Sequence, residues 1–233
     1  MKNYFFECTK GGLIVSCQAL ENEPLHSSYI MSKMAYAAML GGACAIRANT
    51  PVDIKAIKEA TNLPVIGIIK RVYGDCDVYI TPTMTEVNEL MECEADVIAI
   101  DATNRLRPGG KTLEQFFGEI RPKYKDQLFM ADCATYDECV FAKKLGFDIV
   151  GTTLCGYTKE TDATEIPNIP LLRRLGATIN MPVIAEGGIW SPSTLGEIMA
   201  IDGIHAAVVG TAITRPMEIT KRFAAAIRKK SIG

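Results

Sequence analysis

Eight short apolar runs recur through the whole sequence, and each is followed by a polar residue or a glycine. The runs are rich in Val, Ile, Leu and Ala, which is typical of parallel strands buried on both faces of a sheet. The runs, with the residue that follows each, are 13–17 with Gln18, 43–46 with Arg47, 65–69 with Lys70, 97–100 with Asp101, 128–131 with Asp132, 148–151 with Thr152, 183–185 with Glu186, and 206–209 with Gly210.

Helical patterns lie between these runs, so strands and helices alternate. Eight such repeats predict a single (β/α)8 TIM barrel of the phosphate-binding type, formed by residues 1–233 as one domain. In this fold the carboxyl ends of all the strands meet at one mouth, where active sites lie. The expected helices cover residues 28–40, 52–60, 85–93, 113–124, 136–145, 168–178, 193–200 and 216–230.

Composition excludes several classes of partner. The formal net charge of −2 gives no electrostatic reason to expect binding to nucleic acid or to an anionic membrane. No apolar stretch approaches the roughly 20 residues of a membrane span. Residues 1–10 lack the pattern of a signal peptide, so we expect a cytoplasmic protein.

The eight cysteines and two histidines do not suggest a metal site. The cysteines form no CxxC pair, and we expect buried, reduced thiols. His26 and His205 lie in no metal-binding motif, so no metal is expected. Acid–base chemistry must then fall on Lys, Glu, Asp or Tyr.

Two stretches are longer than a minimal barrel needs. Residues 71–82 contain a short extended segment, 77–80, and residues 154–170 form a long polar loop. Long loops after barrel strands are usually functional walls or lids, although either could be a surface decoration.

Two glycine-containing loops predict a phosphate site. Gly187 and Gly188 follow the seventh run, and Gly210 and Thr211 follow the eighth. Barrels of this type hold phosphate at these two loops, where glycines let backbone N–H groups approach an anion. Arg215 adds a fixed positive charge. Either loop alone could instead be only a tight turn.

Lys70 is the main candidate for chemistry. It shares side-chain parity with Ile66 and Ile68, so it points along the barrel wall toward the mouth. It could be a Schiff-base nucleophile, a general base or a solvated lysine. An ordinary lysine costs roughly 4–5 kcal/mol to hold neutral at pH 7; burial would lower this cost, and an adjacent carboxylate would raise it.

Glu186 and Asp132 are the strongest acidic candidates at the mouth. Asp132 and Asp101 could each be a helix N-cap instead, whereas Glu186 precedes two glycines and caps poorly. Gln18 and Arg47 suit substrate positioning, one as a neutral hydrogen-bonding group and the other as a clamp for an anion or hydroxyl. Together these groups fit proton abstraction beside a carbonyl, aldol chemistry or isomerisation of a sugar phosphate.

Several segments resemble the bacterial N-acetylmannosamine-6-phosphate 2-epimerase family, in order, from residue 11 to residue 223. SCQALENEPLHSS and AITRPMEITKRF are the most distinctive. The others are AIRANT, PVIGIIKR, IAIDAT, MADCAT, GTTLCGYT and VIAEGGI.

This resemblance implies an isomerase that interconverts N-acetylmannosamine 6-phosphate and N-acetylglucosamine 6-phosphate during sialic-acid catabolism. It implies no cofactor and a homodimer. Lys70 and Glu186 match the catalytic pair; Gln18, Arg47 and Asp132 would position the sugar. The phosphate would be held by Arg215 with the loops of Gly188 and Gly210.

Two other functions stay open. A Schiff-base aldolase would use Lys70 to attack a carbonyl, and a catalytically silent sugar-phosphate sensor would only bind.

Overall fold

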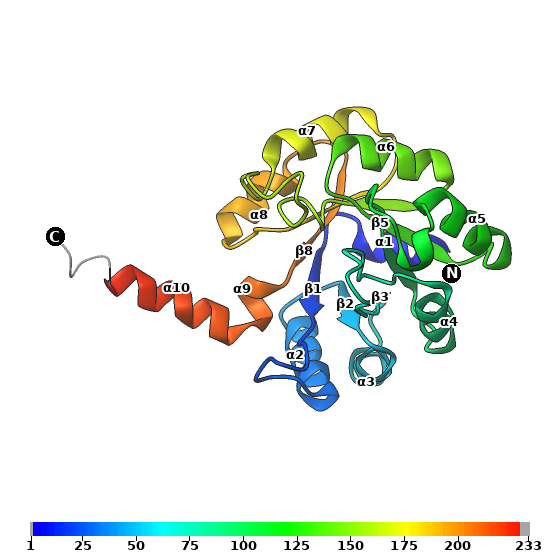
Figure 1. Ribbon diagram of the computed structural model, residues 1–233. Coiled ribbons are helices and arrows are strands. Elements are labelled where there is room, and N and C mark those ends of the chain that lie inside the picture. Colours follow the sequence, from blue (N-terminus) through cyan, green and yellow to red (C-terminus); the bar gives the residue numbers. More distant parts are fainter. Residues whose placement is uncertain (1, 229–233) are drawn as a thin grey trace.

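A computed structural model describes residues 2–228, and in it eight parallel strands close into a barrel (Figure 1). Each strand pairs with its sequence neighbours, and β1 pairs with β8 to complete the ring. This confirms the predicted (β/α)8 barrel. The strands are β1 (Leu13–Cys17), β2 (Ala45–Asn49), β3 (Val65–Ile68), β4 (Val97–Asp101), β5 (Leu128–Asp132), β6 (Ile149–Gly151), β7 (Val183–Glu186) and β8 (Ile204–Val209).

Helices follow the strands, close to the expected positions. Most begin at a side-chain N-cap, as Ser27, Thr83 and Thr135 show. The helices are α1 (Lys2–Thr9), α2 (Ser28–Leu40), α3 (Pro51–Thr61), α4 (Met84–Glu92), η1 (Pro108–Gly110), α5 (Leu113–Lys123), α6 (Tyr136–Leu145), α7 (Ile169–Thr178), α8 (Pro192–Met199), α9 (Thr211–Thr214) and α10 (Pro216–Arg228). The last two residues of the expected helix 216–230 lie outside the described residues.

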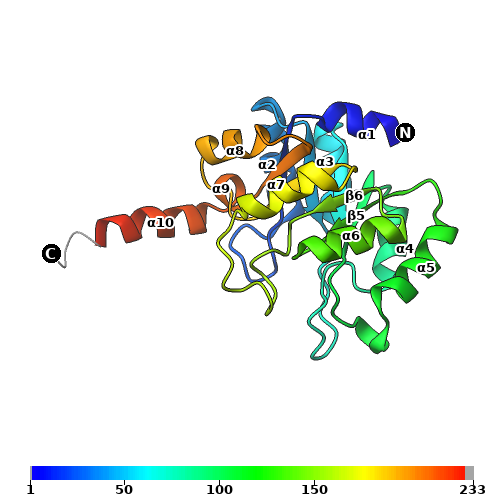
Figure 2. The ribbon, with the colours of Figure 1, turned by 90° about the horizontal axis from the view of Figure 1, so that it is seen from above.

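Besides the short η1, two of these helices were not expected from the sequence. The first, α1, lies at the end of the barrel opposite the long loops (Figure 2). Its Phe5 is buried among the side chains that fill the barrel, and its Thr9 hydroxyl contacts the ring of His205. The second, α9, is a single turn within the loop that follows β8.

The interior of the barrel is filled by side chains of alternate strand positions. Ile66 and Ile68 of β3 both belong to this inner cluster, which confirms the parity inferred for Lys70. The outer faces of the strands pack against the helices in a second, larger cluster. The other strand residues of the inner cluster are Ile14, Ala45, Val97, Ala99, Leu128, Met130, Ile149, Ile184, Ala206 and Val208.

The predicted position of Arg47 was wrong. The sequence suggested that β2 ends at residue 46, but the strand runs on through Asn49, and Arg47 is its middle residue. A charged residue inside a strand interrupts the apolar run by which the strand is recognised, so the sequence pattern places the end of the strand too early. Here the charged side chain is accommodated because carboxylates on other strands pair with it.

Lys70 lies just beyond β3 and is held at its backbone from two sides. Its N–H donates to Asn49 Oδ1 at 2.9 Å, and it forms an antiparallel bridge with Ile80. The expected extended segment 77–80 is reduced to this bridge. The loops that carry residues 71–82 and 154–168 extend from the same end of the barrel (Figure 2).

Helix α10 points away from the barrel, so that it forms a projection (Figures 1 and 2). The sequence places Ile219, Phe223 and Ile227 on one face. Phe223 and Ile227 are 73% and 72% exposed, so this face is largely uncovered in a single chain.

The described residues include no helix long and apolar enough to cross a membrane, and no group of three or more His, Cys, Asp and Glu side chains that could hold a metal ion. All eight cysteines have free thiols. The cytoplasmic location expected from the sequence stays a prediction.

We predict that Gly67→Ala lowers the free energy of unfolding by about 1–3 kcal/mol, as overpacked core substitutions do. A Cβ at Gly67 would lie 2.8 Å from Ala95 Cβ and 2.9 Å from Ile54 Cδ1, so α3 and α4 would have to shift from β3. Urea unfolding measures the change. Gly118→Ala, which meets nothing within 4 Å on exposed α5, is the control and should be neutral or stabilising by about 0.5–1 kcal/mol.

Candidate active site

A cavity of about 550 Å³ opens at the carboxyl end of the barrel. The structure brings almost all of the predicted site residues to its wall, on several different strands and loops. They are Gln18, Arg47, Lys70, Glu186, Gly187, Gly188, Gly210, Thr211 and Arg215. Asp132 alone among the predicted residues does not line it.

Arg47 is fully buried and is held by two carboxylates. Its Nη1 and Nη2 lie 3.0 and 2.5 Å from Asp132 Oδ1 and Oδ2, as a two-pronged ion pair. Nη1 also lies 3.1 Å from Glu186 Oε2. Burial alone would lower the pKa of Arg47, but the two carboxylates raise it above its ordinary value, so the guanidinium is a permanent cation.

Asp132 lies beside Arg47 and does not line the cavity. Its side chain has no exposed surface, and it pairs with the guanidinium. It does not cap α6, because Thr135 does so. Asp132 orients Arg47, whose Nη atoms are both paired with carboxylates. The contacts with the substrate expected for Arg47 and Asp132 stay predictions.

Lys70 faces the same cavity with no partner for its ammonium group. Among residues 2–228, no hydrogen bond or ion pair reaches Nζ. Burial lowers the pKa of Lys70 from 10.5, and Arg47 lowers it further, against the opposing effect of Glu186 and Asp132. The neutral amine is therefore easier to form here than in water.

The pKa of Glu186 is shifted in the opposite direction from that of Lys70. Burial raises its pKa above 4.5, and Asp132 adds to this, whereas Arg47, the Thr153 hydroxyl and Lys70 lower it. Its side chain is 15% exposed, at the wall of the cavity. The two shifts bring the pKa values of the amine and the carboxyl closer together than in water, which suits a pair of groups that both give and take protons.

Two consecutive threonines after β6 hold Glu186, and sequence reasoning missed the second. The Thr152 hydroxyl accepts from the Glu186 backbone N–H at 3.0 Å and lies 2.9 Å from the Glu186 carbonyl oxygen. Thr153 Oγ1 lies 2.7 Å from Asp132 Oδ1 and 3.2 Å from Glu186 Oε2. The only sequence signal was the position of the threonine pair at the end of a predicted strand.

Arg215 reaches the cavity from beyond β8 and is paired with Glu23. Its Nε lies 3.3 Å from Glu23 Oε2, and its Nη2 contacts Oε1. Glu23 was not among the predicted site residues, although it lies within the distinctive segment that follows β1. The ion pair holds the Arg215 guanidinium at the edge of the cavity, beside Thr211.

The glycines of the two predicted phosphate loops are required by close packing. Gly188 has φ +71°, and a Cβ there would lie 2.6 Å from the Ile166 backbone. A Cβ at Gly210 would lie 3.1 Å from Ser16 Cβ. Both loops therefore pack tightly while their backbones stay open to the cavity.

Gln18 also lines this cavity. Its Nε2 donates to Ser16 Oγ at 2.8 Å, while its buried Oε1 has no hydrogen-bond partner in residues 2–228. A buried carbonyl oxygen without a partner is available to accept a hydrogen bond from a bound ligand.

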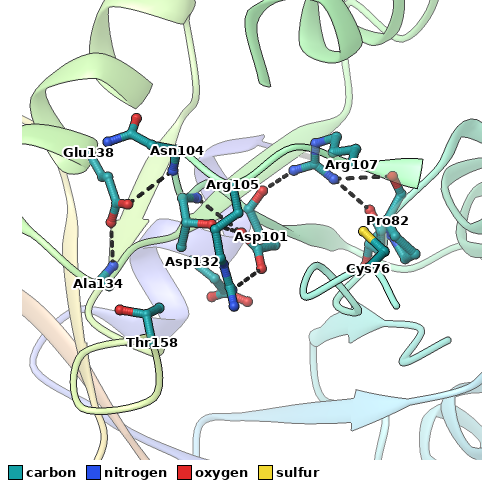
Figure 3. A network of polar contacts seen from close by, with 12 residues as sticks. Cys76, Pro82, Asp101, Asn104, Arg105, Arg107, Asp132, Ala134, Glu138 and Thr158 are labelled. Atoms are coloured by element: carbon teal, nitrogen blue, oxygen red, sulfur yellow. Dashed lines mark hydrogen bonds and ion pairs between the residues drawn. The ribbon is translucent and has the colours of Figure 1, made fainter. Parts of the chain in front are cut away.

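Asp101 lies beside the site in a separate network of polar contacts (Figure 3). It accepts from Thr103 and pairs with Arg105 at 2.7 Å, so it braces the loop after β4 rather than capping a helix. The Arg107 guanidinium donates to backbone carbonyl oxygens, among them that of Asp101. Burial lowers the pKa of Arg107 to about 10.

Comparison with known proteins agrees with this geometry. A family model described as "Putative N-acetylmannosamine-6-phosphate epimerase" matches residues 31–229. The chain belongs to this family. The resemblance seen in the sequence is confirmed, and so is the enzyme class, because an epimerase is an isomerase.

The similarity to individual relatives covers nearly the whole chain. A "Putative N-acetylmannosamine-6-phosphate 2-epimerase" of Enterobacter sp. (strain 638) is 56% identical over 225 residues, 96% of this chain and 95% of the relative. Its counterpart in Caldanaerobacter subterraneus is 53% identical over 222 residues, 95% and 93% of the two chains. The solved structure of the N-acetylmannosamine-6-phosphate 2-epimerase from Clostridium perfringens superposes with a TM-score of 0.90 at 50% identity, and 95% of each chain is covered.

We predict that Arg47→Met lowers the free energy of unfolding by about 3–5 kcal/mol, since it leaves Asp132 and Glu186 buried without their cation. Thermal and urea unfolding measure the loss. Lys221→Met removes an exposed lysine paired with Glu218 and should change stability by less than about 0.5 kcal/mol. Equal stability of the two variants would contradict the importance of the buried ion pairs.

Proposed function

We propose that this chain interconverts N-acetylmannosamine 6-phosphate and N-acetylglucosamine 6-phosphate by inverting C2 through removal and return of its hydrogen. One observation carries the proposal: Lys70 and Glu186, with pKa values shifted toward each other, line one cavity that the two glycine loops and Arg215 also border. The names of the relatives agree with it. The place of the reaction in sialic-acid catabolism stays a prediction.

The chemistry of the substrate sets the order of steps. The C2 hydrogen becomes appreciably acidic only when C1 is a free aldehyde, so the sugar ring opens before C2 loses its proton. Loss of that proton gives an enolate whose negative charge lies on O1. The permanent Arg47 cation in the cavity wall stabilises negative charge that develops nearby.

Lys70 is the group we assign to the C2 proton. Its Nζ has no partner among residues 2–228, and its lowered pKa makes the neutral amine accessible. Glu186, held by Arg47 and Thr153, handles the proton of the ring oxygen or of the opposite face of C2. All of these steps are proton transfers, so the reaction needs no cofactor.

The phosphate is anchored away from the reacting carbon. Backbone N–H groups of the loops around Gly187, Gly188, Gly210 and Thr211 bind its oxygens, and Arg215 neutralises its charge. Gln18 offers its unpartnered Oε1 to a hydroxyl or the N-acetyl N–H group of the sugar. Anchoring both ends keeps C2 beside Lys70.

We predict that Lys70→Ala lowers the rate of epimerisation by at least about 100-fold, because it removes the group that moves the C2 proton. A proton NMR time course with N-acetylmannosamine 6-phosphate in D2O reports turnover and deuterium incorporation at C2 together. Lys111→Ala, in an exposed ion pair with Glu119, is the matched control and should behave as the wild type.

The same time course, together with a borohydride trapping experiment, separates the competing functions. A wild-type protein that binds the sugar but incorporates no deuterium would be a sensor. Covalent capture of Lys70 by borohydride in the presence of substrate would indicate a Schiff-base aldolase. Near-normal epimerisation by Lys70→Ala would contradict the role of Lys70.

We further propose that the protein is a homodimer. The apolar face of α10 is exposed at Phe223 and Ile227, and α2 exposes Tyr29, Tyr36 and Leu40 along one side. Large apolar side chains gathered on a surface are typical of a protein interface. A second copy of the chain would bury both sets.

We predict that the double variant Phe223→Asp, Ile227→Asp is monomeric, because charged groups oppose burial of this face. Light scattering coupled to size-exclusion chromatography should give twice 25.4 kDa for the wild type and 25.4 kDa for the variant. Ala225→Asp, which adds one negative charge to another exposed face of α10, should stay dimeric. A monomeric wild type would contradict the proposal.

A further inference from the structure

Among the described residues, Thr153 is the one uncharged side chain within hydrogen-bond distance of both the Asp132 and the Glu186 carboxylates. Its Oγ1 lies 2.7 Å from Asp132 Oδ1 and 3.2 Å from Glu186 Oε2. A hydroxyl has one proton and two lone pairs, so it can donate to only one carboxylate at a time. The other carboxylate must then bring its own proton or accept from elsewhere.

Within residues 2–228, the Thr153 hydroxyl is the only neutral hydrogen-bond donor to the Glu186 carboxylate. Nη1 of Arg47 on β2 forms an ion pair with Oε2 at 3.1 Å, while Asp132 on β5 repels negative charge. Lys70, after β3, attracts the negative charge of Glu186. Tyr157, on the loop after β6, faces Glu186 from the cavity wall. Asp132 already accepts from both Nη atoms of Arg47, so it does not depend on Thr153 for a donor.

We propose that Thr153 is a positioning residue for Glu186, and that its hydroxyl turns between the two carboxylates as Glu186 gains and loses its proton. When Glu186 is ionised, Thr153 O–H donates to it. When Glu186 is protonated, the Glu186 O–H donates to Thr153 Oγ1, and the Thr153 proton turns to Asp132. No proton leaves Thr153; the hydroxyl stabilises both forms of Glu186 in one position.

Thr152 and Thr153 bind different parts of Glu186. Thr152 binds the Glu186 backbone at both its N–H and its carbonyl oxygen. Thr153 binds the carboxylate, and it lies in the cavity wall where the proton transfers take place. Glu186 is thus placed by residues that are adjacent in sequence, which couples the loop after β6 to the end of β7.

The inference rests on the proposed function, and Thr153→Val tests it because valine matches the shape without the hydroxyl. The hydrogen bond from Thr153 to the ionised carboxylate is stronger than the one between the neutral groups, so loss of the hydroxyl raises the pKa of Glu186. The limb of the kcat/KM profile that reports Glu186 therefore moves to higher pH. This direction holds whether Glu186 acts as acid or as base. We expect kcat to fall by about 10-fold or more, with KM changed by less than about threefold.

Thr153→Ser restores the hydroxyl and should recover the wild-type pH profile. Thr178→Val, on exposed α7 with a hydroxyl that contacts only Tyr136 and the backbone, is the control for removing a threonine hydroxyl elsewhere. Carboxyl ¹³C NMR of Glu186 in the ligand-free protein gives the same pKa direction without activity. If the wild type does not epimerise, the proposed function fails while this titration still tests Thr153.

Two outcomes would overturn the role of Thr153. One is a Thr153→Val protein whose Glu186 titrates at the wild-type pH. The other is a Thr153→Val protein whose lost kcat is not recovered by Thr153→Ser, which would indicate a packing defect rather than a missing hydroxyl.

Discussion

The site depends on one buried guanidinium that two carboxylates share. Desolvating an isolated charge costs several kcal/mol, so Arg47 is tolerated inside the barrel only because Asp132 and Glu186 pair with it. The same cation holds Glu186 at the cavity wall and lowers the pKa of Lys70. A structural requirement of the core therefore also sets the protonation behaviour of the two groups proposed to be catalytic.

The barrel makes this possible because its strands bring distant residues to one end. Arg47 lies on β2, Lys70 follows β3, Asp132 ends β5 and Glu186 ends β7. The inner cluster of the barrel next to these residues is apolar and tightly packed, so water cannot reach their charged groups from inside the barrel. Burial is the largest influence on the pKa of both Lys70 and Glu186, in opposite directions, and the ion pairs then adjust each value.

Much of this could be predicted from the sequence, because strand ends in a parallel barrel are ordered by the fold itself. Apolar runs located β1 to β8, and the residues after them included Lys70 and Glu186. Arg47 was predicted to follow β2 rather than to lie within it, because a single buried charge interrupts an apolar run in the same way as a strand end does. The pairing of Asp132 with Arg47 was not predicted, because burial beside another side chain leaves no mark in sequence.

The residues that sequence reasoning missed are those whose importance depends on contacts between distant parts of the chain. Thr153 is one polar residue in a polar loop until β7 brings Glu186 beside it. Glu23 matters only through Arg215, which lies 192 positions away in sequence. The amphipathic pattern of α10 was visible, but whether its apolar face packs on its own barrel is decided by tertiary structure, and here it does not.

A direct titration of the Lys70 side chain by ¹⁵N NMR, in the ligand-free wild-type protein, tests the electrostatics of the site most directly. The Lys70 signal is assigned by its absence from a Lys70→Arg variant. Burial and the neighbouring Arg47 predict a pKa below 10.5. A Lys70 that titrates at or above 10.5 would show that the carboxylates outweigh burial and Arg47, and would contradict its assignment as the group that takes the proton from C2.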